Sequence, residues 1–489
     1  MNSFIISNLI LYTVEIAKYG QPKQIRVKEI ERLKLENYVV DESGKRPVVI
    51  SVVMPTFNRN DKEYNRTVAN IINTLGNLID NGVIDEVVIA EGSRREDGTP
   101  DSEFMEFLLA TAISYCRTFE NEVNFIRAMP EGKQKALQGR YDFSFRILSQ
   151  VDEELHKIYL KHNILTEEEL EILKHGKGAN MWFSVPVTYG DIVCFIDSDI
   201  VSFKKHYIKG LCRPILLGWR SESEISDNRS SILYTKAAYI RQHKIPGGFR
   251  MGGRLSRLFG IPIFNTLARR NILNGLDSVS YPFSGECAIA RETLNELQFS
   301  NGYDIELSIL CQLWRKYGVD KVAQYDFGFF RHMPGDDKHA EDMLLEISMA
   351  LFYWIKQYNL EYKMGDIDDL LDEYSKTAAG MLDVYKKIAQ EHPGRIRYGM
   401  GEVEMDMEKI SRYKKIIKEG YNLAETNEPK LLKSWSDVKK QMDSKTGYSY
   451  QNLKSTLQQR VNKFTSMTLL SYIRIYVDRS VEIIAKHTE

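Results

Sequence analysis

A run of five apolar residues at 192–196 constrains the fold of this chain more than any other stretch. It predicts a strand that is buried on both faces of a parallel sheet. Asp197, Ser198 and Asp199 follow the run directly. Residues i and i+2 of an extended chain point the same way, and ligands of open α/β sheets bind beyond the carboxyl ends of the strands. Two carboxylates at this place suit a hard divalent cation that also holds a diphosphate.

Apolar runs of strand length alternate with segments of helical periodicity. Further strands are predicted at 48–55, 86–91, 122–126 and 321–328. Helices are expected after the first of these strands, at about 102–119 and from 177 onward. This alternation predicts an α/β protein with a doubly wound, mostly parallel sheet. The stretch 150–175, which is rich in Glu and Leu, is longer than a normal connection and predicts a helical insertion on the surface.

Charge and cysteine usage exclude several classes of protein. The net charge of -1 predicts no general attraction to nucleic acid or to membranes. The five cysteines are scattered and form no Cys-x-x-Cys pair, which favours a reducing compartment and argues against a zinc site. The apolar start of the chain has no basic residue before it and is too short to span a bilayer. We therefore expect a cytoplasmic protein without stable membrane insertion.

The loops that follow the predicted strands carry the polar residues of a binding site. Asn58 follows the first strand and Glu91 ends the second, and both side chains can hydrogen-bond a nucleobase and a ribose. Lys177 lies between two glycines at a helix N-terminus, a place that favours a diphosphate. The sequence contains neither a Gly-x-x-x-x-Gly-Lys-Ser/Thr loop nor a Gly-x-Gly-x-x-Gly after the first strand. Kinase-type and dinucleotide-binding folds are therefore disfavoured.

The segment 228–276 departs most from the average composition. It contains nine Lys and Arg residues and no Asp or Glu, which predicts a local electropositive surface. Within it, the sequence Gly-Gly-Arg-Leu-Ser at 252–256 predicts a pliant loop that opens onto a helix at 257–275. Such a loop suits a small anion such as a phosphate or a carboxylate. A basic patch that meets nucleic acid, lipid or a protein partner is the alternative.

Two more side chains stand at strand or turn boundaries. Glu286 ends a Pro-containing turn and precedes the apolar run 287–290, so it either faces the site or caps the helix that begins near residue 291. His332 follows the last predicted strand, where it could complete a metal site begun by Asp199.

Together these motifs resemble the glucosyl-3-phosphoglycerate synthases. They are, in order, Pro-x-x-Asn, Gly-Ser, Gly-Lys-Gly, Asp-Ser-Asp, Gly-Gly-Arg-x-Ser, Pro-x-Ser-Gly-Glu, Gly-Tyr-x-x-Glu, Gln-x-Asp-x-Gly and a following His. The resemblance covers about 48–340. It implies a retaining glycosyltransferase of the GT-A fold that moves glucose from a nucleoside diphosphate sugar to the 2-hydroxyl of 3-phosphoglycerate.

The resemblance also implies roles for individual residues. The donor site would comprise Pro55, Asn58, Glu91, Ser93, Lys177, Asp197 and Ser198. Asp199 and His332 would bind Mg²⁺ or Mn²⁺. Gly253, Arg254, Ser256 and Asn265 would bind the acceptor. Asp199, Lys177 and Glu286 would be the catalytic group. Arg59 stands where these synthases often have an acidic residue.

The expected organisation has three parts. Residues 1–47 form an N-terminal extension or an extra pair of strands. Residues 48–340 form the catalytic domain, with a nucleotide-sugar half at 48–200 and an acceptor half at 201–340. Residues 341–489 form a helical region that packs on this domain or on a second subunit, and we expect a homodimer. The donor stays open between UDP-glucose and GDP-mannose. A lipid-linked or other anionic acceptor, and a non-catalytic relative that only binds nucleotide sugars, are the alternatives.

Overall fold

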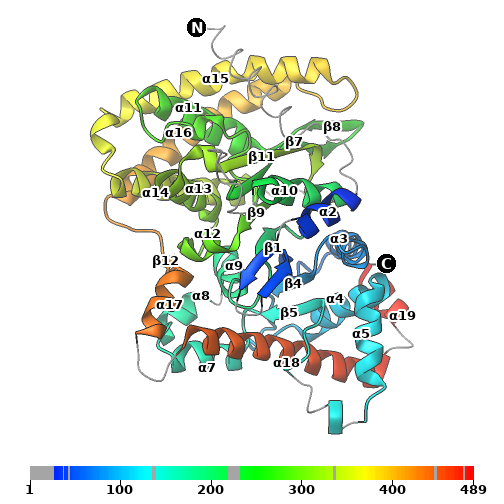
Figure 1. Cartoon of the computed structure of the whole chain (residues 1–489). Helices are drawn as coiled ribbons and strands as arrows, with labels where there is room; N and C mark the ends of the chain where they lie inside the picture. Colours follow the sequence, from blue (N-terminus) through cyan, green and yellow to red (C-terminus); the bar gives the residue numbers. More distant parts are fainter. Residues whose placement is uncertain are drawn as a thin grey trace. The chain divides into compact units, whose positions relative to one another are not determined.

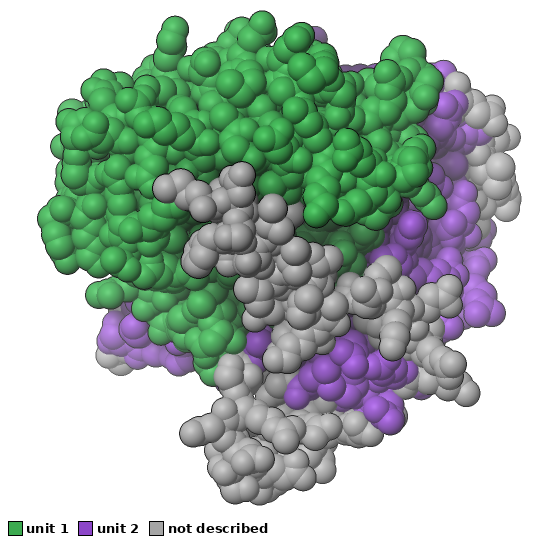
Figure 2. Space-filling model, turned by 90° about the horizontal axis from the view of Figure 1, so that it is seen from above, with its two compact units in different colours: residues 1–23, 234–285, 300–431 green, residues 24–233, 286–299, 432–489 purple. Residues whose placement is uncertain are grey.

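The computed structural model describes residues 27–488, apart from 37, 42–43, 131, 135–138, 174, 219–231, 334–336, 445–448 and 477–479 (Figure 1). The described chain divides into two compact units, which Figure 2 colours separately. Unit 1 contains residues 234–285 and 300–431. Unit 2 contains residues 24–233, 286–299 and 432–489.

The sheet of unit 2 has the strand order β9-β6-β3-β4-β5. Its strands are β3 (Ile50–Thr56), β4 (Glu86–Glu91), β5 (Phe145–Ser149), β6 (Ile192–Phe195) and β9 (Cys287–Ala290). β3, β4, β5 and β6 pair in parallel, and β9 is antiparallel to β6. Every residue of β4, β5, β6 and β9 is buried, because helices and connections cover the sheet. The apolar run at 192–196 thus forms the buried strand that its composition predicted.

Helices make up most of the remainder of unit 2. They are α2 (Val27–Glu36), α3 (Lys62–Asp80), α4 (Ser102–Tyr115), α5 (Arg117–Arg127), α7 (Glu153–Lys161), α8 (Glu167–Leu173), α9 (Lys177–Ser184), α10 (Lys205–Gly218), α12 (Arg291–Glu296), α17 (Trp435–Asp443), α18 (Tyr450–Tyr476) and α19 (Ser480–Thr488). α3 begins where the Asp61 side chain accepts hydrogen bonds from the amides of Glu63 and Tyr64. α9 packs against β3 and β4, and α10 packs against β6 and β9.

Unit 1 has its own strands and a layer of long helices. β7 (Tyr234–Ile245) pairs in parallel with β11 (Val322–Arg331) and antiparallel with β8 (Gly248–Met251). Its helices are α11 (Ile261–Arg269), α13 (Ile305–Tyr317), α14 (Asp337–Gln357), α15 (Ile367–Glu391) and α16 (Met400–Ala424). α15 packs on α11 and α14 packs on α16 (Figure 1).

The predicted fold class is confirmed. Mostly parallel strands alternate with helices, and the described part of 341–489 is mainly helical. Of the N-terminal extension, residues 1–26 lie outside the described part of the chain. β1 (Tyr38–Asp41) and β2 (Gly44–Pro47) form the expected pair of strands. The division of 48–340 into donor and acceptor halves stays a prediction.

The strand predicted at 122–126 is wrong. These residues lie in α5, where Phe119, Val123 and Ile126 recur at helical spacing and are buried. The third strand of the parallel series is instead β5. The predicted helix at 102–119 breaks at Cys116 into α4 and α5.

Two further predictions need adjustment. The helix expected at 257–275 begins as a π-helical turn at Leu255–Gly260 and continues as α11, which ends at Arg269. The insertion 150–175 contains the predicted helices, α7 and α8, but it is not purely a surface feature. One face of α7 is buried, because α18 packs on it.

Candidate functional site

Lys177 and Asp197 meet at the carboxyl edge of the unit 2 sheet. Lys177 Nζ lies 2.7 Å from Asp197 Oδ1. Lys177 is the first residue of α9, and Gly176 before it has a φ of 105°, a conformation that favours glycine. Asp197 follows the end of β6. Both residues were predicted to bind the donor, and they form one charged group.

Asp199 has a cationic neighbour from another strand. Arg59 follows β3, and its Nη2 lies 3.1 Å from Asp199 Oδ2. The Arg59 guanidinium also lies over the Tyr64 ring, 4.9 Å from the ring centroid. Tyr64 is buried, and its hydroxyl is 2.9 Å from Ser198 Oγ. The loop of Asp197, Ser198 and Asp199 is thus held by Lys177, Tyr64 and Arg59.

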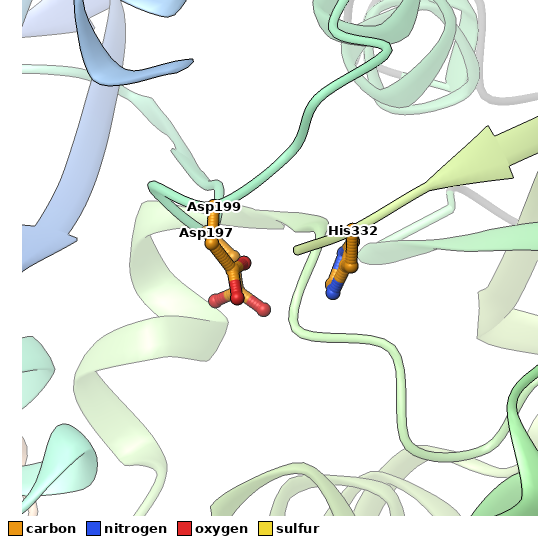
Figure 3. A group of neighbouring side chains, drawn as sticks. All are labelled: Asp197, Asp199 and His332. Atoms are coloured by element: carbon orange, nitrogen blue, oxygen red, sulfur yellow. The ribbon is translucent and has the colours of Figure 1, made fainter. Parts of the chain in front are cut away.

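The described residues contain one group of His, Cys, Asp and Glu side chains with the geometry of a metal site. One ligand atom from each of Asp197, Asp199 and His332 lies within 4.8 Å of the others. The aspartates come from the loop after β6, and His332 comes directly after β11 (Figure 3). Two carboxylates and one imidazole form a ligand set that suits Mg²⁺ or Mn²⁺.

The loops after β3 and β4 are joined by hydrogen bonds. Thr56 pairs with Glu91 in the parallel register, so Pro55, Asn58, Glu91 and Ser93 lie at the same sheet edge. The backbone amide of Asn58 donates to Ser93 Oγ at 2.5 Å, and the backbone amide of Ser93 donates to Glu91 Oε1 at 2.7 Å. Asn58 Nδ2 donates to Asp101 Oδ2 at 2.9 Å. These hydrogen bonds join the two loops into one polar surface at the sheet edge.

Glu91 is fully buried, and burial raises its pKa to about 8. The hydrogen bonds from Ser93 lower the pKa but only in part offset the burial. Oε2 of Glu91 has no hydrogen-bond partner among the described residues. At neutral pH Glu91 is therefore mostly protonated and carries a hydroxyl group that can donate a hydrogen bond.

Glu286 lies at the same sheet edge. It immediately precedes β9, and the pairing of Phe195 with Cys287 sets it beside the end of β6. Its side chain is fully buried. The four residues of β9 lie between Glu286 and α12, so Glu286 does not cap that helix.

The predicted anion-binding residues belong to unit 1. Gly253 has a φ of 71°, and a Cβ there would lie 2.4 Å from the Tyr281 hydroxyl, so the position requires glycine. Arg254 follows, and its Nε donates to Asp406 Oδ1 at 2.9 Å. Ser256 is buried. Asn265 Nδ2 donates to the Ile261 carbonyl at 2.8 Å, within its own helix.

Carboxylates from elsewhere in the chain offset part of the positive charge predicted for 228–276. Carboxylates of the C-terminal helices pair with four of the arginines. Arg254 and Arg257 pair with Asp406 on α16, and Arg269 and Arg270 pair with Glu373 on α15. Lys236 is buried and donates to the Ser284 carbonyl at 2.8 Å. Arg229 lies outside the described residues.

No family model matches the sequence. Over 300 residues the chain is 26% identical to the glucosyl-3-phosphoglycerate synthase of Mycobacterium tuberculosis (strain ATCC 25618 / H37Rv), which covers 60% of this chain and 68% of that protein. Over 206 residues it is 29% identical to the synthase of Petrotoga mobilis, which covers 41% of this chain and 57% of that protein. The chain is similar in sequence to glucosyl-3-phosphoglycerate synthases. This agrees with the resemblance that the motifs indicated.

A solved synthase structure is also similar. It is the Mycobacterium tuberculosis glucosyl-3-phosphoglycerate synthase in complex with Mn²⁺, uridine-diphosphate-glucose and phosphoglyceric acid. The TM-score is 0.45 and the identity is 22%, over 69% of this chain and 86% of that one.

The sequence motifs did not reveal every residue at the site. Tyr64 and Asp406 were missed. The helical pattern of α3 predicts only that Tyr64 is a core residue, although its hydroxyl contacts Ser198. Asp406 lies 152 residues from Arg254 and belongs to no motif. Arg59 was visible in the sequence only as a departure from the synthases.

Proposed function

We propose that this protein is a retaining glycosyltransferase that moves glucose from UDP-glucose to the 2-hydroxyl of 3-phosphoglycerate. The observation that carries the proposal is the contact of Lys177 with Asp197, beside the hydrogen-bonded loops of Asn58, Glu91 and Ser93. A nucleoside site and a diphosphate site then adjoin on one sheet edge of unit 2. The curated relatives are named for this reaction.

The donor residues divide the nucleotide sugar between them. Asn58, Ser93 and the protonated Glu91 offer hydrogen bonds to the uracil and the ribose. Pro55 lies near the end of β3 and is only partly buried, so its ring offers an apolar contact at the same edge. Asp197 and Ser198 extend the site toward the ribose. Lys177, at the start of α9, donates to the diphosphate.

The residues at this edge fit a divalent cation. Asp199 and His332 would hold it, with Asp197 in the same group. A bound Mg²⁺ or Mn²⁺ supplies electrostatic stabilisation of the leaving diphosphate. Within the chain, the Lys177 ammonium also attracts the negative charge that the leaving group gains.

The acceptor half of the proposal rests on the loop at 252–256. Arg254 holds the phosphate or the carboxylate of 3-phosphoglycerate with its planar fork. Gly253 lets the backbone approach the ligand, and Ser256 and Asn265 complete the set. The acceptor's 2-hydroxyl attacks the anomeric carbon of the glucose, and its proton passes to the leaving phosphate oxygen on the same face. Glu286 acting as a nucleophile is the rival route to retention.

A donor-by-acceptor matrix tests the function. UDP-glucose and GDP-mannose are each incubated with 3-phosphoglycerate, glycerate and a lipid-linked acceptor, and the released nucleoside diphosphate is measured. The anomeric configuration of the product is read by NMR. We expect release only with UDP-glucose and 3-phosphoglycerate, together with an α-linked product. Donor binding without release for any acceptor would favour a non-catalytic nucleotide-sugar binder. Release with the lipid acceptor alone would favour the lipid-directed enzyme.

Cytoplasmic location and a homodimer stay predictions. Across the part of the chain that the structure describes, every helix is too short or too polar to cross a membrane.

A further inference from the structure

A buried carboxylate from the C-terminal helices holds two arginines of the Gly-Gly-Arg loop. Asp406 lies in α16 and is 1% exposed. Its Oδ1 accepts from Arg254 Nε at 2.9 Å, and its Oδ2 accepts from Arg257 Nη2 at 2.9 Å. The Tyr398 hydroxyl donates to the same Oδ2 at 2.8 Å. One carboxylate therefore faces two permanent positive charges, and the cluster keeps a net charge of about +1.

The two arginines differ in what surrounds them. The Arg257 guanidinium is buried, lies 4.6 Å from the centroid of the Tyr385 ring and donates from Nε to the Gly252 carbonyl at 2.8 Å. The Arg254 side chain is 16% exposed and is reached by Asp406 through Nε. Arg257 is thus a part of the packed interior, whereas Arg254 lies at its margin.

Asp406 is itself fixed with respect to the loop. Just before α16, the Arg397 amide donates to the Phe249 carbonyl at 2.8 Å, and the Met251 amide donates to the Arg397 carbonyl at 3.2 Å. These backbone bonds attach the start of the α16 segment to β8, which leads into Gly252. Burial raises the pKa of Asp406, but Arg257, Tyr398 and Arg254 outweigh this effect, so the pKa lies below its usual range and the carboxyl stays ionised.

An arginine that is held at Nε has lost its rotamer freedom before a ligand arrives. A free arginine pays this cost on binding, and a preorganised one does not. We propose that Asp406 is a positioning residue for acceptor recognition, which fixes Arg254 for the phosphate or carboxylate of the acceptor. The proposal rests on the proposed function, because it takes Arg254 as the acceptor's anion ligand. It assigns a part in acceptor binding to α16, which lies in the C-terminal helical region beyond the motifs.

The sign of the effect separates positioning from simple charge. Removing a negative charge beside an anion site strengthens anion binding by Coulomb attraction. Removing the residue that orients Arg254 weakens it. Asp406→Asn should raise the KM for 3-phosphoglycerate by roughly 2- to 12-fold, the cost of fixing one long side chain. The KM for UDP-glucose should not change.

Glu373→Gln is the matched control. Glu373 also comes from the C-terminal helices and also pairs with two arginines of the same segment, Arg269 and Arg270. These arginines lie at the far end of α11 from the glycine loop. The control should leave the KM for 3-phosphoglycerate unchanged. A general loss of charge or of packing would move both variants together.

The experiment uses the full chain and two readouts. Calorimetry measures the binding of 3-phosphoglycerate and of inorganic phosphate in the presence of UDP and Mn²⁺, and steady-state kinetics measures both KM values and kcat. Weaker 3-phosphoglycerate binding by Asp406→Asn, with the donor KM and Glu373→Gln unaltered, supports the proposal. Equal or tighter binding by Asp406→Asn overturns it.

Asp406→Asn leaves Arg257 buried without its counter-charge, so a second variant guards against loss of the fold. Asp406→Glu keeps the charge and moves the carboxylate by one methylene group. It should also raise the KM for 3-phosphoglycerate, and an unchanged value in this folded variant overturns the proposal. Wild-type protein that binds neither 3-phosphoglycerate nor inorganic phosphate overturns the proposed acceptor as well. Wild-type binding that Asp406→Asn retains in full overturns the positioning role alone.

Discussion

Arg59 Nη2 and Asp199 Oδ2 lie 3.1 Å apart at the edge where β3 and β6 end. The arginine therefore neutralises the carboxylate that we assign to the metal. A divalent cation that binds Asp199 therefore competes with the Arg59 charge for this carboxylate. Arg59, which stands where these synthases often have an acidic residue, therefore lies at the centre of the proposed site.

Arg59→Ala should tighten the binding of Mn²⁺ in the absence of donor. An ion pair of this exposure contributes about 0.2–1 kcal/mol, so the affinity should rise about 1.4- to 5-fold. Titration of Mn²⁺ by electron paramagnetic resonance measures it. Arg94→Ala is the control, because Arg94 follows β4 and contacts His175 instead of a carboxylate of the group. Equal tightening in both variants would show that only the general charge of the surface matters.

Asp199→Ala should abolish transfer, because it removes one of the few oxygen ligands of the proposed metal. His332→Ala should change activity in the same direction but less. Product formation is measured across a range of Mg²⁺ and Mn²⁺ concentrations. Asp97→Ala, which removes an exposed carboxylate from the loop after β4, should behave as wild type. Full activity of Asp199→Ala in excess chelator would be incompatible with a metal at this place.

Arg254→Ala should raise the acceptor KM by tens to hundreds of fold with little effect on the donor KM. Charge-assisted hydrogen bonds contribute about 1.5–3 kcal/mol each, and the proposal places the diphosphate elsewhere, at Lys177. Arg254→Lys should restore only part of the affinity, because a point charge cannot form the planar fork.

Arg269→Ala serves as the control for Arg254, since it removes a charge from the same segment at the Glu373 pair. Liposome binding is measured in parallel. An unaltered 3-phosphoglycerate KM in Arg254→Ala, together with weaker liposome binding, would replace the soluble acceptor with a lipid-linked one.

Glu91→Gln should change how stability depends on pH. Burial raises the pKa of Glu91 from 4.5 to about 8, so the folded protein holds a proton that the unfolded chain releases. The proton stabilises the folded state fully below about pH 4.5, and this stabilisation is lost as the pH rises toward 8. Each unit of difference between the folded and unfolded pKa corresponds to about 1.4 kcal/mol in the free energy of unfolding. Glutamine keeps an acceptor for the Ser93 amide and cannot ionise.

The free energy of unfolding of Glu91→Gln should therefore increase relative to that of wild type as the pH rises from 5 to 8. Denaturant titrations at several pH values measure the difference. Glu122→Gln is the control away from the site, because burial raises the pKa of Glu122 to about 7. The free energy of unfolding of Glu122→Gln should also increase relative to wild type as the pH rises, but over a narrower pH range. The donor KM of this variant should not change. A constant difference for Glu91→Gln across this range would contradict a protonated Glu91.

The strands of unit 2 could be predicted because each is a short apolar run with polar residues at its end. The run at 122–126 failed for a physical reason: a half-buried amphipathic helix and a short strand share the same apolar residues over five positions. Phe119, four residues before Val123, completes the helical face. Only the wider window distinguishes the two.

The residues proposed to bind the donor could be placed together from the sequence, because the parallel strands β3, β4 and β6 end at one edge. The partner of Arg254 could not, because Asp406 lies 152 residues away on a helix whose pattern shows only its apolar face. The absence of acid in 228–276 therefore predicted more uncompensated positive charge than the described ion pairs leave. The counter-charges are supplied by other parts of the chain.

The outer strand of the unit 2 sheet has a consequence for the synthesis of the chain. β5 ends the strand order, and its Ile147 amide donates to Thr465 Oγ1 of α18 at 3.0 Å, across 318 residues of sequence. At about 5–20 residues per second, the ribosome synthesises this part of α18 roughly 16–64 s after β5. During that time the nascent sheet has an unprotected edge, which is a template for pairing with other chains. Chaperones that shield strand edges should therefore affect the yield of this protein more than its final stability.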